Sequence, residues 1–425
     1  MVEAPLIARH FPALTSRNFR LFWSGQFVSL VGSWMQSTAL PFLAYRLTSQ
    51  PIYLGLVGFA SAIPALLFML PAGVYVERHD KRTIVIAMQI ILMLQAFALS
   101  YLALTRLINI WLIILLSFIA GLANSVEVTA RQAMIIELID DRAHISNAIA
   151  LNSTIFNTAR VIGPMLAAPF LLLLKDQGEG WAFFANGVSY LFVIVGLLFV
   201  NSHSEIAPPA PGSSLKAEFM QGQRFVRQTP IVGMLILLVT VMAVFGFPFS
   251  QQLPVFARDV LKEVGDNAAS VATRNSLLVT AQGIGAFIAA FSLAFFSNIK
   301  RKGLMLSAGQ IVFACGLIGL GYIRHIGLAM PAMILIGWGM VTSLALSNTL
   351  VQVSIPDELR GRVISIYYWA QNGAAPFGSL LIGWMAQNWG APLAVAVGGA
   401  ICLVMALVIH TTQPVVRKAT GVVQA

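Results

Sequence analysis

Charged side chains are scarce in this 425-residue sequence. Asp, Glu, Lys and Arg together make up 10% of it, whereas 58% is hydrophobic. Soluble domains carry roughly 25% charged residues. Apolar runs of about 20 residues, the length that crosses a lipid bilayer, recur along the whole chain. The scarcity of charge therefore excludes an ordinary soluble protein and predicts a membrane protein.

Cysteine is nearly absent as well. Cys315 and Cys402 both lie inside apolar segments, so the sequence offers no disulfide framework. The six histidines stand singly in termini and loops, without the spacing of a metal site. The sequence also lacks a Gly-x4-Gly-Lys-Ser/Thr loop that would cradle nucleotide phosphates. We therefore expect no catalytic residues, no metal and no cofactor.

A polar interval divides the apolar segments into two sets of six. The predicted spans are 19–43, 52–76, 83–104, 110–136, 146–174 and 181–200, then 231–254, 275–297, 304–322, 328–352, 363–386 and 391–409. Short matches recur between the halves, such as Ile139-Asp140-Asp141-Arg142 and Ile355-Pro356-Asp357-Glu358, 216 residues apart, as internal repeats in transporters do. We expect an all-α membrane protein with twelve transmembrane helices in two pseudo-symmetric six-helix bundles, residues 1–200 and 230–425, joined by a cytoplasmic linker at 201–229.

Lysine and arginine are distributed unevenly between the two sets of loops that twelve spans create. The set that contains both termini holds 18 of the 26 basic residues, the opposite set holds seven, and Arg160 lies within a span. Because basic loops tend to stay in the cytoplasm, both termini are expected there, with the chain in the cytoplasmic (inner) membrane. Topology thus explains the net charge of +10, and no nucleic-acid partner is expected.

The linker has two parts of different composition. Residues 208–211 are rich in proline and mark a connector. Further on, Leu215, Phe219 and Val226 share one side of a predicted helix whose other side is basic, a pattern that suits a membrane surface. An unstructured connector is the alternative.

The loop after the second span carries a recognisable motif. A glycine near the end of the span is followed by an acid, an arginine and a basic pair, at Gly73, Glu77, Arg78, Lys81 and Arg82. This order resembles the loop between helices two and three of the major facilitator superfamily of secondary transporters. Two positions depart from the family pattern, because Glu77 replaces an Asp and Asp80 replaces a second Gly.

The resemblance implies a gating role for this loop. In the family, the acid of the loop latches against the start of helix eleven when the cytoplasmic side is closed. Here Arg360 and Arg362 open the eleventh span, and a helix N-terminus carries partial positive charge. We therefore predict that Glu77 contacts that end, with Arg78 and Arg82 in the same cluster.

The fifth span contains Gly163-Pro164 followed by Ala167-Ala168, which looks like the Gly-Pro motif of exporters in that superfamily. Small residues permit close helix packing and proline bends a helix, so we interpret the pair as a conformational element. A packed kink without substrate contact is the alternative. Similarity to the enterobactin-exporter and macrolide-efflux branch lies in residues 14–23, 131–133, 147–153 and 356–363. It implies export driven by proton antiport.

Besides Arg20 at the start of the first span, three charged side chains fall within predicted spans: Glu127 and Arg131 in the fourth, and Arg160 in the fifth. Glu127 sits roughly 15 Å from the cytoplasmic end of its helix, where an unpaired charge costs at least ~2.5–3.5 kcal/mol. These groups should therefore pair or face water. The Glu127–Arg131 spacing suits a structural ion pair. The alternative is a proton carrier, whose charged form Arg131 or Arg160 would stabilise on approach.

Polar faces of spans one and four predict a solute path, to which the family resemblance adds spans seven and ten. The predicted cavity residues are Gln26, Ser29, Ser33, Gln36, Asn124, Phe245, Phe247, Gln251, Ser343 and Ser347. Interhelical hydrogen bonds are the alternative role for such polar side chains. A cavity with few charges and many apolar walls favours a large amphipathic solute.

Together these patterns predict a secondary transporter, monomeric and without a cofactor, that uses the proton gradient as its driving force. Its expected partner besides the lipid bilayer is an amphipathic small molecule, such as a siderophore, a macrolide or another drug, exported by alternating access. A lysophospholipid flippase, or a facilitative or uptake carrier on the same fold, is the alternative. A polytopic membrane enzyme is less favoured, since the sequence shows no catalytic constellation.

Overall fold

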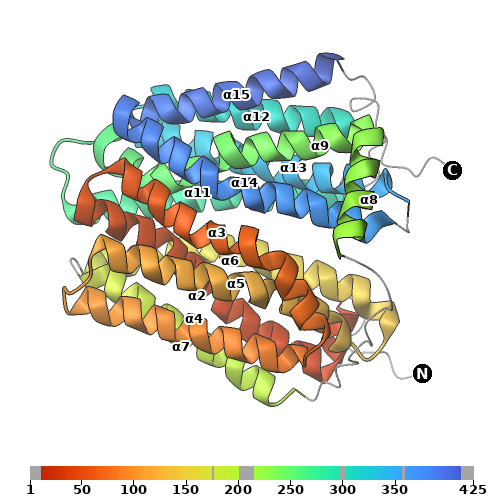
Figure 1. Cartoon of the computed structure of the whole chain (residues 1–425). Helices are drawn as coiled ribbons and strands as arrows, with labels where there is room; N and C mark the ends of the chain where they lie inside the picture. The colour runs from red at the N-terminus through yellow and green to blue at the C-terminus, as the bar shows by residue number, and fades with distance from the viewer. Residues whose placement is uncertain (1–10, 175–176, 201–214, 296–301, 357–358, 413–425) are drawn as a thin grey trace. The chain divides into compact units, whose positions relative to one another are not determined.

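The computed structural model describes residues 11–174, 177–200, 215–295, 302–356 and 359–412. Within these ranges every regular element is a helix (Figure 1), which confirms the all-α fold class. The chain forms two compact units. The first consists of Met1–Leu43 with Ile63–Pro209, and the second of Ala44–Ala62 with Ala210–Ala425.

Six long helices occupy the first half of the chain, each within a few residues of its predicted span. They are α2 (Arg17–Thr48), α3 (Pro51–Glu77), α4 (Lys81–Leu104), α5 (Ile110–Glu137), α6 (Ile145–Leu173) and α7 (Gly178–Leu198), with short 3-10 turns η1 (Pro12–Thr15) and η2 (Arg142–His144). Asp80 accepts a hydrogen bond from the Thr83 N–H at 2.9 Å and so caps α4. An acceptor at this position satisfies a free backbone donor. The residue that replaces the family's second glycine is therefore a helix cap.

The second half begins with a short helix and continues with the remaining spans. The elements are α8 (Leu215–Gln228), α9 (Pro230–Val241), η4 (Met242–Gly246), η5 (Phe247–Gln252), α10 (Leu253–Val255), η6 (Phe256–Val260), α11 (Ala268–Phe295), α12 (Lys302–Tyr322), α13 (Ile326–Val353), α14 (Arg360–Trp389) and α15 (Ala391–Thr412).

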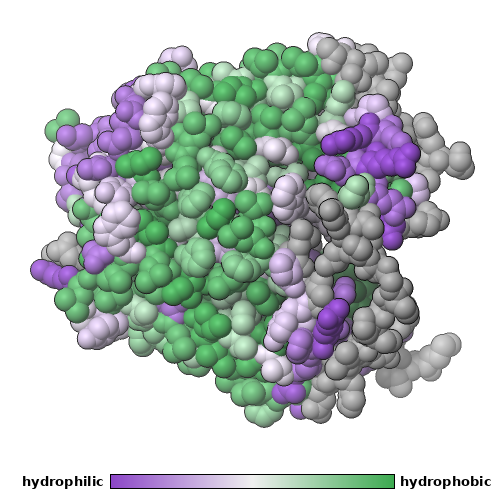
Figure 2. Space-filling model, viewed as in Figure 1, coloured by the Kyte–Doolittle hydropathy of each residue, from purple (hydrophilic) through white to green (hydrophobic). Residues whose placement is uncertain are grey.

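Ten helices in the described ranges are long and apolar enough to cross a membrane. The ten do not include α2 and α14, which are 32 and 30 residues long but carry more polar side chains. Both are long enough to span a bilayer, so the prediction of twelve spans is consistent with the structure. Figure 2 shows apolar side chains along the middle of the helices and hydrophilic ones near their ends.

The seventh span is broken, which the hydropathy pattern did not predict. After α9 the backbone passes through a π-helix (η4), a 3-10 helix (η5), one α turn and a second π-helix (η6). Pro248 and Pro254 lie in this stretch, and proline lacks the N–H that would continue the α ladder. Irregular backbone at membrane depth is tolerated where protein buries it. Phe249 and Phe256 are accordingly 1% and 0% exposed.

The stretch Ala44–Ala62 belongs by sequence to the first bundle but packs with the second unit. The Tyr45 hydroxyl donates to Asp259, and Arg258 donates to Ser49 Oγ at 2.8 Å. A Cβ on Gly55 would lie 2.6 Å from the Ser379 carbonyl oxygen. The units therefore depart from the predicted division at residues 1–200 at the end of α2 and the start of α3.

The predicted amphipathic helix is present as α8, while linker residues 201–214 lie outside the described ranges. In Figure 1 it runs across the end of α9. A Cβ on Gly222 would lie 2.9 Å from Ile366 Cδ1 of α14, and Arg362 donates to Gln221 Oε1. Arg224 and Arg227 are exposed. The side chains of Leu215 and Phe219, on which the predicted apolar side depends, are not described.

Candidate functional site

A cavity of about 230 Å³ lies within the first unit. Five helices, α2, α4, α5, α6 and α7, contribute to its wall. The lining residues are Gln26, Ser29, Leu30, Ser33, Trp34, Ser37, Gln89, Leu92, Asn124, Glu127, Val128, Arg131, Phe156 and Tyr190. Four predicted cavity residues from spans one and four (Gln26, Ser29, Ser33 and Asn124) are thus brought together with Glu127 and Arg131 of α5.

Glu127 is the acid of this cavity, and it is 3% exposed. Its Oε1 accepts from Arg131 Nε at 3.0 Å, one helical turn along α5, and from Gln89 Nε2 of α4 at 3.1 Å. Arg131 is 7% exposed. The cavity therefore holds a buried carboxylate. Glu127 acts only as an acceptor in its described hydrogen bonds, and both of them end on Oε1.

Close packing of α4, α5 and α7 positions these groups. Leu92 and Ala96 of α4, Ala123 of α5, and Tyr190 and Ile194 of α7 form one buried cluster beside the carboxylate. Two of the five side chains are alanines, which let neighbouring helices approach. Gln89 reaches Glu127 because α4 and α5 are held side by side in this way.

The third embedded charge, Arg160, lies over an aromatic ring. Its guanidinium carbon is 5.2 Å from the centroid of the Trp34 ring, within the range of a cation–π interaction. Phe156 meets the same ring edge-on, with centroids 5.7 Å apart. Trp34 and Phe156 also line the cavity. Glu127 thus forms its ion pair with Arg131, whereas Arg160 lies over the aromatic ring of Trp34.

A second polar chain connects α2 to α4 and α7. Ser33 Oγ lies 3.1 Å from the Tyr190 hydroxyl. Gln36 donates to Gln95 Oε1 at 3.2 Å and accepts from Asn186 Nδ2 at 2.8 Å. Gln36 was predicted to line the cavity but is not among its lining residues. Its amide instead bonds to helices α4 and α7.

Gly163, one half of the predicted helix-five motif, is a point of close approach between α6 and α2. A Cβ on Gly163 would lie 2.5 Å from Trp34 Cβ and 2.8 Å from the Val31 carbonyl oxygen. Helix α6 continues through Pro164 to Leu173. The glycine therefore permits tight packing behind a cavity-lining aromatic residue.

The loop residues that the sequence grouped together have different partners in the first unit. Lys81 forms an ion pair with Glu137 of α5. Arg82 donates from Nε to the Leu197 carbonyl at 2.8 Å and from a terminal nitrogen to the Leu198 carbonyl at 2.9 Å, at the end of α7. These two basic groups tie α4 to its neighbours inside the unit.

The other predicted gating residues carry less structural information. Glu77 is the exposed last residue of α3, and Arg78 beside it is also exposed. A Cβ on Gly73 would meet no described atom within 4 Å. The side chain of Arg360 lies outside the described part of the structure. The latch between Glu77 and the start of α14 stays a prediction.

Predicted cavity residues of the second unit are packed among helices. Ser343 and Ser347 of α13 are both 0% exposed, and Ser343 Oγ donates to the Gly339 carbonyl at 2.6 Å. Phe247 meets Phe313 of α12 with ring centroids 6.2 Å apart. Phe245 and Gln251 are half-buried in the broken seventh span. Their part in a solute path stays a prediction.

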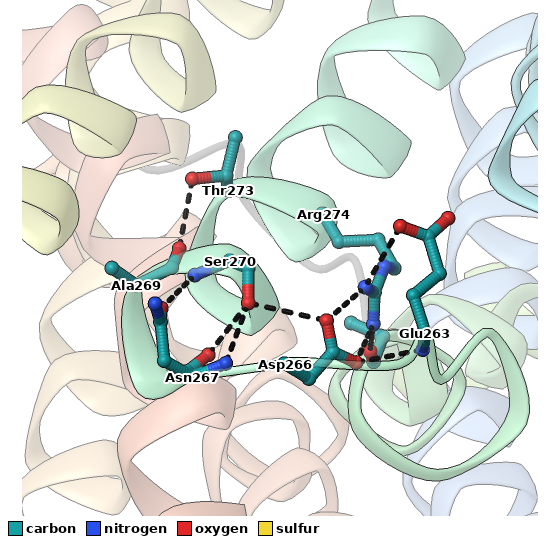
Figure 3. A network of polar contacts seen from close by, with 8 residues as sticks. Glu263, Asp266, Asn267, Ala269, Ser270, Thr273 and Arg274 are labelled. Atoms are coloured by element: carbon teal, nitrogen blue, oxygen red, sulfur yellow. Dashed lines mark hydrogen bonds and ion pairs between the residues drawn. The ribbon is translucent and has the colours of Figure 1, made fainter.

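A second ion pair, which the sequence did not indicate, joins the buried Arg274 of α11 to the half-buried Asp266 in the preceding loop (Figure 3). Arg274 is 4% exposed and donates to both carboxylate oxygens of Asp266, at 2.9 and 2.6 Å, and to the Ala257 carbonyl at 2.6 Å. Hydrogen bonds from Arg274 and from the Glu263 backbone N–H hold the pKa of Asp266 well below its usual range. The cluster thus binds the end of the broken span to the next helix.

The cavity contains residues that sequence reasoning missed, namely Trp34, Ser37, Gln89, Phe156 and Tyr190. Gln89 alone had a usable signal, because an amide inside an apolar span needs a partner. The aromatic residues had none, since aromatic side chains face lipid, core or cavity equally well. No group of three metal-ligating side chains occurs among the residues that the structure describes.

Known proteins resemble the chain over nearly its full length. The staphyloferrin A transporter of Staphylococcus aureus is 25% identical, with 91% of this chain and 94% of that protein covered. Macrolide efflux protein A of Streptococcus pyogenes is 21% identical over 92% and 94%. The enterobactin exporter EntS of Shigella boydii is 24% identical over 85% of each chain.

The fold is shared with solved transporters. The crystal structure of a D-xylose-proton symporter aligns with a TM-score of 0.71 at 14% identity, covering 94% of this chain and 99% of that one. The family described as transmembrane secretion effector matches residues 8–422. These relatives are transporters, which confirms the prediction of a transporter in place of an enzyme. The chain therefore belongs to the transmembrane secretion effector family of the major facilitator superfamily, as a multi-pass membrane transporter.

Proposed function

We propose that the protein exports an amphipathic small molecule in exchange for protons, and that Glu127 carries the proton. The observation that supports this most strongly is a buried carboxylate in the wall of a cavity, held by Arg131 and Gln89. An ionisable group at such depth is costly and is a functional candidate. Its position in a transporter family points to the transport cycle.

The chemistry of the pair suggests how protonation is coupled to movement. With Glu127 ionised, its charge balances that of Arg131. Adding a proton removes the attraction and leaves Arg131 without a counter-ion, which is unfavourable until water or another acceptor reaches its guanidinium. Arg131 must then move toward water, toward another acceptor or toward a solute in the cavity. Protonation thereby biases one arrangement of the helices over another.

The lining of the cavity supports an amphipathic substrate. Trp34 and Phe156 offer flat apolar surface, whereas Gln26 and Ser29 offer hydrogen-bonding groups. Large solutes of mixed polarity fit such a wall better than small ions. The names of the relatives (a siderophore transporter, a siderophore exporter and a macrolide efflux protein) favour a siderophore or a macrolide.

The distribution of charges supports a finer proposal for the placement of the protein. The excess of basic residues on one set of loops favours the inner membrane with both termini in the cytoplasm. We regard the monomer as the working unit, without a bound cofactor and with the proton gradient as the driving force. Glu77, exposed at the end of α3, is the proposed latch for Arg362 when the cytoplasmic side closes.

Uptake into inside-out vesicles tests the proposal. Erythromycin, a catecholate siderophore and amphipathic dyes are offered with and without an imposed proton gradient. Gradient-dependent accumulation of one of them, abolished in Glu127→Gln, is the expected result. Accumulation that ignores the gradient would contradict proton coupling and would support a facilitator or a lysophospholipid flippase. Undiminished gradient-driven uptake by the variant would reduce Glu127 to a structural partner of Arg131.

A further inference from the structure

Gln89 of α4 is in an unusual position for a buried amide. It is 2% exposed, and its Nε2 donates to Glu127 Oε1. The other end of the amide, Oε1, is buried without a hydrogen-bond partner among the described residues. A buried carbonyl oxygen without a partner costs free energy, so this oxygen calls for an explanation.

The hydrogen bonds around Glu127 suit only one of its protonation states. Both groups that bond to Glu127 Oε1, the Arg131 Nε–H and the Gln89 Nε2–H, are donors. A carboxylate needs donors, but a protonated carboxylic acid is itself a donor and needs an acceptor. Arginine has no acceptor to offer, whereas an amide has one oxygen and one nitrogen of nearly the same shape. Gln89 can therefore change roles and Arg131 cannot.

We propose that Gln89 is a positioning residue that matches its hydrogen bond to the proton on Glu127. With Glu127 ionised, Gln89 donates through Nε2, as the structure shows. When Glu127 takes up a proton from the cavity, a half-turn of the amide presents Oε1, which accepts the new carboxylic O–H. The proton leaves by the reverse step, and Gln89 itself exchanges no proton. This inference rests on the proposed role of Glu127.

The other charged or titratable groups near Glu127 leave this role to Gln89. Arg131, on the same helix, only donates. Arg160 of α6 lies over the Trp34 ring and likewise only donates. Tyr190 of α7 lines the same cavity and bonds to Ser33, and its hydroxyl is the rival acceptor. Among the residues that the structure describes, no other Asp, Glu, Lys or His lines the cavity.

Gln89 bonds to both protonation states of Glu127 in this proposal. The relative strength of these two hydrogen bonds decides in which direction loss of the amide shifts the titration of Glu127. The bond from Gln89 to the ionised carboxylate is charge-assisted and about twice as strong as a neutral bond to the acid. Loss of the amide thus harms the ionised state more. The pH midpoint of Glu127 protonation should rise by about one pH unit.

Infrared titration of the purified protein in detergent tests this without any substrate. The C=O band of a protonated carboxylic acid that disappears in Glu127→Gln belongs to Glu127. The variant is Gln89→Met, which has a similar length and no amide. The matched control is Gln95→Met on the same helix. Gln95 is 3% exposed, has an amide nitrogen without a partner, and accepts from Gln36.

The expected result in Gln89→Met is a midpoint about one pH unit higher and a C=O band at higher frequency, since the acid has lost its acceptor. Gln95→Met and Tyr190→Phe should leave both readings unchanged. Should Gln89→Met fail to assemble, Gln89→Asn keeps an amide that is too short to reach, and it should give the same shifts.

An unchanged midpoint and band in the Gln89 variants would overturn the inference while leaving Glu127 as the proton carrier. A band frequency that moves in Tyr190→Phe but not in Gln89→Met would assign the acceptor to Tyr190. If no band disappears in Glu127→Gln at any pH, Glu127 does not titrate, and the proposed function fails together with the inference.

Discussion

Among the described residues, each unit of the molecule holds an arginine–carboxylate pair with a buried arginine, and the two pairs differ in their surroundings. In the first unit Glu127 and Arg131 line a cavity, and a single oxygen, Oε1, receives both described hydrogen bonds to the carboxylate. In the second, both oxygens of Asp266 accept bonds, Oδ1 from Arg274 and Ser270, and Oδ2 from Arg274 and the Glu263 N–H.

The difference separates a carboxylate that borders open space from one whose hydrogen bonds keep it ionised at neutral pH. Every bond to Asp266 favours the ionised form, and its location between η6 and α11 closes a loop. Glu127 borders space that water or a solute can enter, so its partners can rearrange. An arginine and a carboxylate thus form a structural clasp in the second unit, between Arg274 and Asp266, and a candidate coupling site in the first.

Asp266→Asn should give the largest loss of stability, because it leaves the buried Arg274 without its counter-ion. The expected cost is about 3–5 kcal/mol, measured by denaturant unfolding of the detergent-solubilised protein. Glu263→Gln is the control, since Glu263 is 55% exposed and 3.8 Å from Arg274, and should cost no more than about 0.5 kcal/mol. Protein that remains folded should still transport. Equal losses in the two variants would contradict the clasp.

Glu127→Gln should show the opposite combination of effects. The amide oxygen can still accept from Arg131, and the cavity lets water reach the arginine, so the expected loss of stability is only about 1–2 kcal/mol. Gradient-driven transport should nevertheless disappear. The same unfolding assay, combined with vesicle uptake, checks both parts. A Glu127 variant as unstable as Asp266→Asn would mean that both pairs are structural.

Acidification should weaken the clasp between Asp266 and Arg274 in the wild-type protein. The folded pKa of Asp266 lies below its unfolded value because Arg274 donates to it, so its stabilising contribution is complete well above about pH 4 and is lost as the pH falls further. The denaturation temperature of the wild type should therefore fall more steeply below about pH 4 than that of Asp266→Asn. Parallel curves would show that Asp266 does not carry this pH dependence.

Arg82→Gln should have a smaller effect, confined to the first unit. It removes two hydrogen bonds to the carbonyls at the end of α7 and a positive charge near that helix end, worth about 1 kcal/mol. Thermal unfolding in detergent measures it. Arg78→Gln, an exposed neighbour in the same loop, should change stability by less than about 0.5 kcal/mol. An equal effect of the two variants would show that the hydrogen bonds from Arg82 to the end of α7 contribute nothing to stability.

Glu77→Gln should have the smallest effect. If Glu77 latches against α14, neutralising it weakens the closed cytoplasmic state by about 0.2–1 kcal/mol without altering the fold. Accessibility of single cysteines placed at the cytoplasmic helix ends to a membrane-impermeant thiol reagent reports the balance of states. The expected change is faster labelling. Unaltered labelling would show that Glu77 does not stabilise the closed cytoplasmic state.

Hydropathy was sufficient for most of the fold because a bilayer imposes a length on each apolar helix. It missed the breaks in the seventh span, since Pro248 and Pro254 are apolar and leave the hydropathy profile unchanged. Local spacing was sufficient for the pairing of Glu127 with Arg131, four residues apart. It could not place Gln89 against Glu127, because that contact depends on how α4 packs against α5.

The loop motif shows a different limit. The order of charges identified the family, but not the partner of each charge. Lys81 and Arg82 bond to α5 and α7, which a linear motif cannot reveal. The clasp around Asp266 was missed for the same reason, as its arginine lies eight residues beyond the acid, inside α11.

The most direct test of coupling is proton movement driven by the solute alone. Proteoliposomes carrying the transporter are given a gradient of a compound that accumulates in the vesicle assay, with no imposed pH difference, and an internal dye follows pH. Because coupling is reciprocal, we predict that the wild type moves protons against the solute flow and that Glu127→Gln moves solute without protons or not at all. Solute flow with no pH change in the wild type, or an equal pH change in the variant, would contradict proton exchange at Glu127.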